Sequence, residues 1–281
     1  MVKKVSDEID IGSMIEPVSA MELIISALFY GKSGTGKTTL ASSFPGPILL
    51  MDFNEKGWDS VSNVENLEVL KVTSWKMVEP AYWYIKKNIN KYKTIIIDQV
   101  TSMQEMCRNQ VLENEEKTEM SLRLFGVVSG EMKTWLVNYR NLTDDGINVV
   151  FLAHDRVSKD EDDDDGDDQI MPSIGPQLMP SIAGTLAGAV KVIGNTFIRE
   201  RFGPRDKETK KRDRFVDYCM RVGPHSVYAT KLRTQKGNDV PMFIVDPTYE
   251  KILELMRNGF KKPEVKVQPT KIVKRKVQNG S

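Results

Sequence analysis

The sequence predicts an α/β fold in which a mostly parallel sheet is flanked by helices and closed by late antiparallel strands. Short apolar runs alternate with helical segments along much of the 281 residues, which is typical of a parallel sheet. The run at 94–98 is continuously apolar rather than alternating, as expected for a strand covered on both faces. The first apolar run leads directly into a glycine-rich loop and a helix, the arrangement that binds phosphate groups.

That loop follows a strand predicted at 23–30 and matches the pattern G-x-x-x-x-G-K-[ST]. Its glycines let the backbone bend and present successive N–H groups to an anion. In this pattern Lys37 reaches the β- and γ-phosphates, and the Thr38 hydroxyl ligates Mg²⁺. We therefore expect ATP and Mg²⁺ as cofactors. The expected nucleotide-binding residues are Gly31, Lys32, Ser33, Gly34, Thr35, Gly36, Lys37, Thr38 and Thr39.

The remaining elements are predicted from hydrophobic periodicity. Further parallel strands are expected at 47–52, 94–98 and 148–154, with a short edge strand at 67–72. Helices are expected at 78–88, 104–114, 128–142 and 248–258, and antiparallel strands at 214–221 and 226–233. We divide the chain into a segment at 1–20 that is a candidate for linking subunits, an ATPase core at 21–260 and a flexible basic tail at 261–281. Within the core, 156–190 is predicted to be a long mobile loop with an acidic insert.

Composition limits the cellular setting that we expect. Hydrophobic residues make up 40% of the chain, yet no apolar run is long enough to span a membrane. The first residues turn acidic too early for a signal peptide. Cys107 and Cys219 lie far apart, without metal-like spacing or a secreted-type framework. These observations predict a cytoplasmic protein without membrane partners.

The net charge of +1 conceals separated clusters. Residues 160–168 contain eight acids, and without them the charge would be +9. Basic residues gather at 191–214 and again in the tail, which suggests a polyanionic partner. The acidic run has three interpretations: a disordered solubilising insert, an internal mimic of DNA, or a calcium loop. The last fits poorly, because Pro172 falls where an EF-hand needs its final glutamate.

Three further residues are candidates for catalysis. Asp98 ends a buried strand and is the expected Walker B carboxylate, which holds Mg²⁺ together with Thr38. The next residue is Gln99, whereas many P-loop ATPases have a catalytic glutamate there. Glu55, after the second strand, is therefore the candidate general base. His154, at the end of a later strand, is the third candidate.

This pattern resembles the RecA/RadA/DnaB group of P-loop ATPases. The resemblance implies a RecA-like core and a catalytic glutamate after the second strand. It also implies a polar sensor at the His154 position, where an imidazole could bond the γ-phosphate and report hydrolysis. The group's usual Asp-x-Glu spacing would fall on Asn54, so Glu55 fits with a shift of one residue. The segment at 228–233 is similar to the group's Lys-x-Arg finger, which implies that Lys231 and Arg233 enter a neighbouring subunit's active site.

The narrowest resemblance is to phage-encoded RecA-like ATPases of the single-strand annealing or recombinase type, over about 23–256. It rests on 31–38, 94–102, 124–126 and 148–154. It implies a magnesium-dependent, DNA-stimulated ATP hydrolase that forms a ring or filament on single-stranded DNA and promotes annealing or strand exchange in the host cytoplasm. A single-strand-binding protein is a further candidate partner, and 120–130 and 156–188 are the expected DNA-facing loops.

Other functions remain open from the sequence. A kinase on the same core is one, although no arginine-rich lid is visible. An ATP-gated loader or regulatory protein with slow hydrolysis is another, and a helicase motor is a third. A GTPase is disfavoured, because no Asn-Lys-x-Asp motif occurs.

Overall fold

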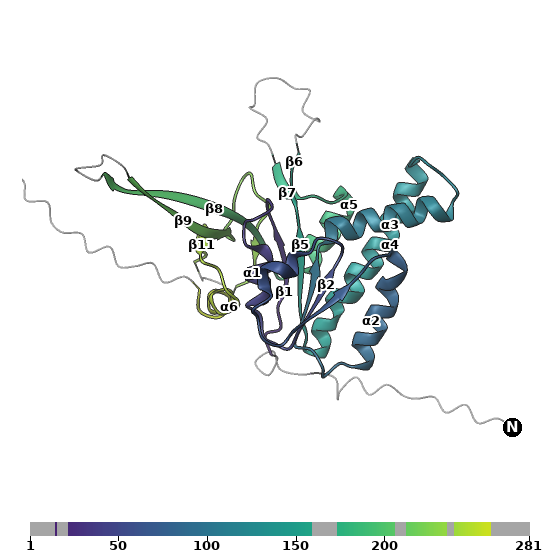
Figure 1. Ribbon diagram of the computed structural model, residues 1–281, viewed down its shortest axis with the longest axis horizontal. Coiled ribbons are helices and arrows are strands. Elements are labelled where there is room, and N and C mark those ends of the chain that lie inside the picture. The colour runs from purple at the N-terminus through teal and green to yellow at the C-terminus, as the bar shows by residue number, and fades with distance from the viewer. Residues whose placement is uncertain (1–14, 16–21, 159–172, 206–211, 235–238, 260–281) are drawn as a thin grey trace, which may run out of the picture.

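The computed structural model contains one central sheet with helices on both faces (Figure 1). It describes residues 15, 22–158, 173–205, 212–234 and 239–259. The sheet has nine strands, eight of which follow the order β11-β9-β8-β1-β5-β4-β2-β3, with β10 paired to β8. The predicted α/β fold, with a mostly parallel sheet and late antiparallel strands, is therefore confirmed.

The parallel part of the sheet consists of β1 to β5 and the start of β8. Its strands are β1 (Ser26–Tyr30), β2 (Ile48–Asp52), β3 (Leu67–Lys71), β4 (Thr94–Asp98) and β5 (Asn148–Ala153). Every residue of β1, β2, β4 and β5 is buried, because helices cover both of their faces. β3 lies at the edge of the sheet, as the sequence predicts.

Two layers of helices build the two halves of the core. Alternate residues of each strand point to opposite faces, so Ile95 and Ile97 belong to one apolar cluster and Ile96 to the other. The first cluster is closed by α2 (Val78–Lys87), α3 (Val100–Asn114), α4 (Leu122–Asn141) and α5 (Pro180–Ala189). The second is closed by α1 (Lys37–Ser42) and α6 (Tyr249–Asn258). Short 3₁₀ turns η3 (Gly57–Val61), η4 (Trp75–Met77) and η5 (Leu142–Asp145) complete the connections.

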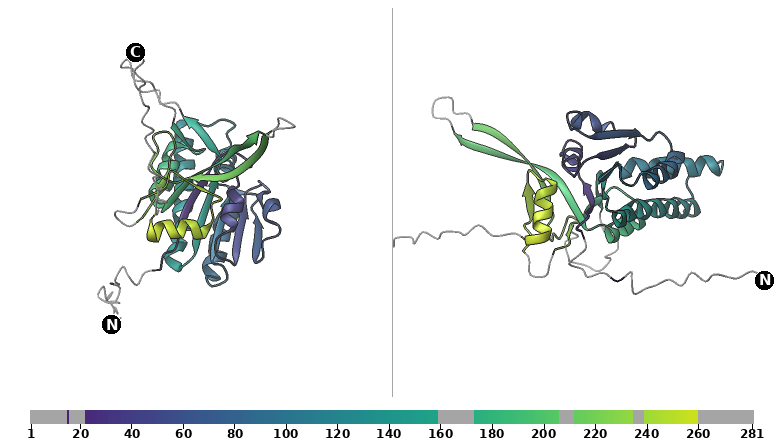
Figure 2. Two further views of the ribbon diagram at one scale, coloured as in Figure 1. Left: turned by 90° about the vertical axis from the view of Figure 1, so that its left-hand side faces the viewer. Right: turned by 90° about the horizontal axis from the view of Figure 1, so that it is seen from below.

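A long antiparallel ribbon, β8 (Val192–Arg205) with β9 (Arg212–Arg221), extends the sheet beyond its helical layers (Figures 1 and 2). The first residues of β8 pair parallel with β1 and are buried, whereas its second half pairs only with β9. β11 (Phe243–Val245) borders the inner end of β9, and β10 (Lys231–Leu232) pairs with the start of β8. The sequence pattern predicts β9 but not β8, whose Gly194 and Asn195 break its apolar run.

Several sequence expectations are wrong. The segment expected to be a DNA-facing loop at 120–130 is mostly the start of α4, and α3 and α4 both begin earlier than predicted. The predicted loop at 156–190 contains β6 (Asp155–Ser158), β7 (Ser173–Pro176) and α5, because β6 and β7 pair as a hairpin. The expected strand at 226–233 is reduced to the two residues of β10. The acidic run at 160–168, the segment 1–20 apart from residue 15, and the tail at 261–281 lie outside the described residues.

Within the described part of the chain, no helix is both long enough and apolar enough to cross a membrane.

Candidate active site

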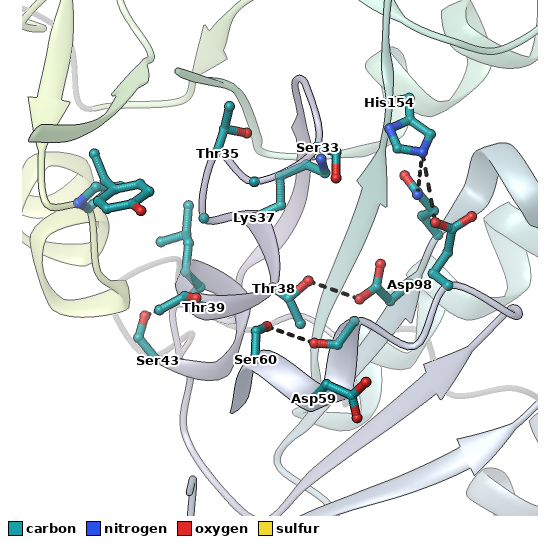
Figure 3. A pocket seen from close by; sticks show the side chains of 18 of the residues that line it. Ser33, Thr35, Lys37, Thr38, Thr39, Ser43, Asp59, Ser60, Asp98 and His154 are labelled. Atoms are coloured by element: carbon teal, nitrogen blue, oxygen red, sulfur yellow. Dashed lines mark hydrogen bonds and ion pairs between the residues drawn. The ribbon is translucent and has the colours of Figure 1, made fainter. Parts of the chain in front are cut away.

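The glycine-rich loop lies where β1 meets α1, at the carboxyl end of the parallel strands (Figure 3). Gly34 and Gly36 have φ values of 76° and 83°, which strongly favour glycine and turn the loop's N–H groups inward. The Lys37 ammonium donates to the carbonyl oxygens of Gly31 and Lys32, both at 2.9 Å. Burial lowers the pKa of Lys37. These features provide a cradle for the phosphate groups of a nucleotide, with one cation inside it.

Strand β8 supports this loop from behind. The Thr35 and Thr196 hydroxyl oxygens lie 2.7 Å apart and share a hydrogen bond. A side chain at Gly31 would come within 3.0 Å of two oxygen atoms of Thr196, so only glycine allows this approach. The loop motif identifies Gly31 and Thr35 from the sequence. No such signal identifies Thr196, which lies in β8, the strand that the sequence does not predict.

Asp98 and Thr38 form the candidate Mg²⁺ site. The Thr38 hydroxyl donates to Asp98 Oδ2 at 3.0 Å, and both face the loop (Figure 3). Burial raises the pKa of Asp98 to about 6, and the nearby carboxylates of Glu55 and Asp52 add to this effect. Two oxygen ligands beside a phosphate cradle fit Mg²⁺, which usually keeps several waters and takes its other ligands from phosphate. Among the described residues no cluster of three or more metal-binding side chains occurs, so the nucleotide would complete the coordination.

Gly57 lies directly against this pair. A Cβ atom there would lie within 3.0 Å of Asp98 Oδ2 and 3.1 Å from Thr38 Oγ1. The position therefore admits no side chain while Asp98 and Thr38 remain bonded. Nothing local in the sequence distinguishes Gly57 from an ordinary turn glycine, and it is absent from the site residues predicted above.

The turn after β2 brings Glu55 to the same site. Asp52 Oδ1 accepts from the backbone N–H groups of Glu55 and Lys56 at 2.8 and 3.0 Å, and Asn54 adopts a φ of 67°. This tight turn explains why Glu55 can occupy the site despite its shift of one residue from the Asp-x-Glu spacing. The Glu55 carboxylate accepts a short hydrogen bond from the Ser102 hydroxyl.

His154 and Gln99 join Glu55 in one polar cluster. Glu55 Oε2 lies 3.8 Å from His154 Nε2, which in turn lies 2.8 Å from the amide nitrogen of Gln99. The Gln99 amide and His154 Nε2 therefore share a hydrogen bond. The buried Oε1 atom of Gln99 has no hydrogen-bond partner among the described residues. The structure thus brings Glu55, His154 and Asp98 together around one cavity. It also places Gln99 there, which the sequence analysis noted only because many P-loop ATPases have a glutamate at that position.

Lys231 and Arg233 lie away from the glycine-rich loop of their own chain. β10 pairs with Val192 and Ile193, at the amino end of β8, whereas the loop follows the carboxyl end of β1. The Lys231 ammonium donates to the Ala187 carbonyl at 2.7 Å, and Arg233 donates to Gly188 at 3.4 Å. Both therefore cap the carboxyl end of α5 here. Their predicted action on a neighbouring subunit stays a prediction.

The cavity between these residues has a volume of about 690 Å³. Beyond the phosphate cradle it is bordered by Tyr218 of β9 and by residues 246–248. The Tyr218 ring packs over Gly36, 3.3 Å from where a Cβ would lie. This end of the cavity is the natural place for a nucleotide base, since an aromatic face and backbone groups border it. The sequence gives no sign of it, because the contributing segments come from distant parts of the chain.

The fold and site together define a P-loop nucleoside triphosphatase: a parallel sheet, a phosphate loop with its lysine, and a threonine–aspartate pair for magnesium. The model of a family described as an AAA domain matches residues 25–234. The chain therefore belongs to this family of AAA-type P-loop ATPases. No curated protein is similar enough to this chain to be matched with it.

Proposed function

We propose that this protein is a DNA-stimulated ATP hydrolase that assembles on single-stranded DNA and promotes annealing or strand exchange. The proposal that the protein hydrolyses ATP is supported above all by the cluster of Glu55, His154 and Gln99 beside the Thr38–Asp98 pair. A site that only held a nucleotide would need the phosphate cradle but no carboxylate and imidazole at the γ-phosphate end.

In this proposal a water molecule attacks the γ-phosphorus of ATP while its proton passes to Glu55. The bond from the γ-phosphorus to the bridging oxygen breaks, and ADP and phosphate result. Lys37 stabilises the charge on the phosphates. Mg²⁺, held by Thr38 and Asp98, would supply further neutralisation of that charge.

No arginine lines the described cavity, and its cations are Lys37 and Lys56. Arginine fingers raise the rate by about 10³- to 10⁵-fold in related phosphoryl transfers, so an isolated subunit should hydrolyse ATP slowly. This supports assembly into a ring or filament in which Lys231 and Arg233 of a neighbour complete the site. It equally supports the alternative of an ATP-gated loader or regulatory protein. A kinase is less favoured, since no arginine of the described cavity is placed to hold a phosphate acceptor.

The proposal of DNA as the polyanion is supported by the positive charge that remains outside the acidic run and by the resemblance to phage-type recombinases. Homo-oligomers are expected from the similarity of 228–233 to the Lys-x-Arg finger, and a single-strand-binding protein is a candidate partner.

The test is steady-state ATP hydrolysis with and without single-stranded DNA, with Lys37→Ala as the blank. Stimulation by DNA that disappears in Lys37→Ala is the expected result. Turnover that DNA leaves unchanged, together with no retention on DNA at low salt, would contradict the DNA part of the proposal. A mixture of wild-type and Arg233→Ala subunits should show lower activity than the same amount of wild-type alone.

A further inference from the structure

The outer part of the β8–β9 ribbon carries a group of side chains that neither the core nor the nucleotide site uses. We call residues 201–205 and 212–215 the ribbon tip. The ribbon projects well away from the helical layers in Figure 1 and in the right-hand view of Figure 2. Phe202 is 58% exposed and Phe215 is 49% exposed, although burial is the usual state of a phenylalanine. Two exposed rings on a projecting ribbon indicate a binding surface.

The pairing register places each of these rings beside an arginine. Phe202 is directly opposite Arg214, and Phe215 is directly opposite Arg201. Since directly opposite residues share a face, each face of the ribbon tip carries one phenylalanine with an arginine directly opposite it. The Arg201 guanidinium lies 6.0 Å from the centre of the Phe215 ring. The same pairing of ring and cation thus occurs on both faces.

The arginines of the ribbon tip indicate an anionic occupant. The ribbon tip holds four arginines and one acid, Asp213. With the flanking Glu200 and Asp217, which pair with two of these arginines, the described residues 200–205 and 212–217 carry a net charge of +1. Ion pairs hold two of the arginines in place: Arg201 with Asp217 at 2.6 Å and Arg214 with Glu200 at 2.5 Å. Arginines interleaved with two exposed rings are the side chains that contact the phosphates and bases of a single-stranded nucleic acid.

We propose that the ribbon tip binds single-stranded DNA, with bases stacked on Phe202 and Phe215 and phosphates held by the neighbouring arginines. This inference rests on the proposed function and names the surface that contacts DNA. Single strands expose base faces that aromatic side chains can stack against, and duplexes do not. The surface replaces the loop expected at 120–130, which is helical.

The face that carries Phe202 continues toward the nucleotide cavity. Val216 and Tyr218 follow Arg214 at every second position of β9, so all three point to the same side as Phe202. Tyr218 is the residue that packs over Gly36 of the phosphate loop. A strand lying on this face would therefore reach the rim of the cavity, which provides a direct route for DNA to influence ATP turnover.

The experiment measures the anisotropy of fluorescein-labelled dT30 with the full-length protein at fixed salt. Phe202→Ala and Phe215→Ala should each weaken binding about 5- to 150-fold, as expected when one base no longer stacks. Trp83→Ala is the matched control, because Trp83 is an equally exposed aromatic residue, 50% exposed, on α2. All three variants should keep the wild-type melting temperature and DNA-free ATPase rate.

A second measurement tests the contribution of the arginines through the salt dependence of DNA binding. Replacing both Arg212 and Arg214 with glutamine should lower the slope of log affinity against log salt by about 0.7 for each phosphate that the protein no longer neutralises.

The outcomes separate this proposal from the proposed function. If wild-type protein binds dT30 and the phenylalanine variants bind as tightly as Trp83→Ala, the ribbon proposal is wrong and the function stands. If the wild-type protein does not bind dT30, both are wrong. Unchanged affinity with a smaller sedimenting species would instead make the ribbon tip a contact between subunits. Tighter binding of a 30-base-pair duplex than of dT30 would also overturn the proposal.

Discussion

Replacing Gly57 with alanine tests whether the Thr38–Asp98 pair is the magnesium site. The added methyl group would lie 3.1 Å from Thr38 Oγ1, 3.3 Å from the Asp98 carboxyl carbon and closer still to Oδ2. Gly57 has no left-handed φ, so the substitution acts through this contact and not through backbone strain. The Asp98 carboxylate must therefore retreat, by a distance on the order of 1 Å, and lose its hydrogen bond to Thr38.

A displacement of that size in a positioned group costs about 10²-fold in rate. Hydrogen bonds to charged groups contribute about 1.5–3 kcal/mol, so the apparent affinity for Mg²⁺ should fall by about 10- to 100-fold. The assay is ATP hydrolysis over a magnesium titration, with nucleotide binding measured in parallel without the metal. We expect a higher magnesium requirement, a lower maximal rate and little change in metal-free nucleotide affinity.

Gly126→Ala is the matched control. Gly126 lies within α4, and a Cβ there would meet nothing within 4 Å. It should raise helix stability by up to about 1 kcal/mol and leave the magnesium titration unchanged. A Gly57→Ala protein with the wild-type magnesium titration and maximal rate would refute the assignment of this site.

Four further predictions concern the same cavity. The Asp98 pKa of about 6 means that Mg²⁺, which binds the carboxylate form, should bind about tenfold more weakly at pH 5 than at pH 7.5. In the metal-free protein, the free energy of unfolding depends on pH in the direction opposite to that of the magnesium affinity. The raised pKa makes the folded state bind more protons between about pH 4 and 6, so the free energy of unfolding should fall over that range as pH rises. Denaturant titrations of wild-type and Asp98→Asn should show this dependence only in the former. Glu55→Gln should reduce kcat by about 10²- to 10⁴-fold with little change in nucleotide affinity, measured by single-turnover hydrolysis, and an unchanged kcat would remove Glu55 from the mechanism. Tyr218→Ala should weaken ATP binding by about 2- to 10-fold while Tyr218→Phe retains it, as checked by equilibrium binding; equal loss in both would show that the hydroxyl matters and not the ring.

The part of this protein that sequence predicts well depends on local pattern. The phosphate loop needs its glycines, Lys37 and Thr38 within a few positions of one another, and buried strands such as β4 need only a run of apolar residues. Asp98 follows from the same reasoning, because it ends such a strand. Glu55 is predicted by its place after the second strand, although its reach into the site depends on a turn held by Asp52.

The part that sequence misses depends on contacts between distant segments. Thr196 supports the phosphate loop from 161 positions away from Thr35, and no pattern near it indicates this. Gly57 is required by atoms on β4 and α1, which periodicity cannot reveal. Strand β8 is not predicted because its buried start and exposed end have different patterns, so neither half resembles a whole strand.

Strand β8 joins two different environments, and its pairing with β9 has one register shift, between Phe202 and Arg205. Thr196 touches the phosphate loop, and Arg205 ends the same strand nine residues later, which is about 30 Å at the usual rise per residue. A paired strand resists stretching, so a force applied at the far end arrives at Thr196 with little loss. There the contact with Gly31 leaves no slack to absorb it. A load on the outer end of the ribbon should therefore reach the nucleotide site, and hydrogen exchange in the phosphate loop should change when that end is loaded.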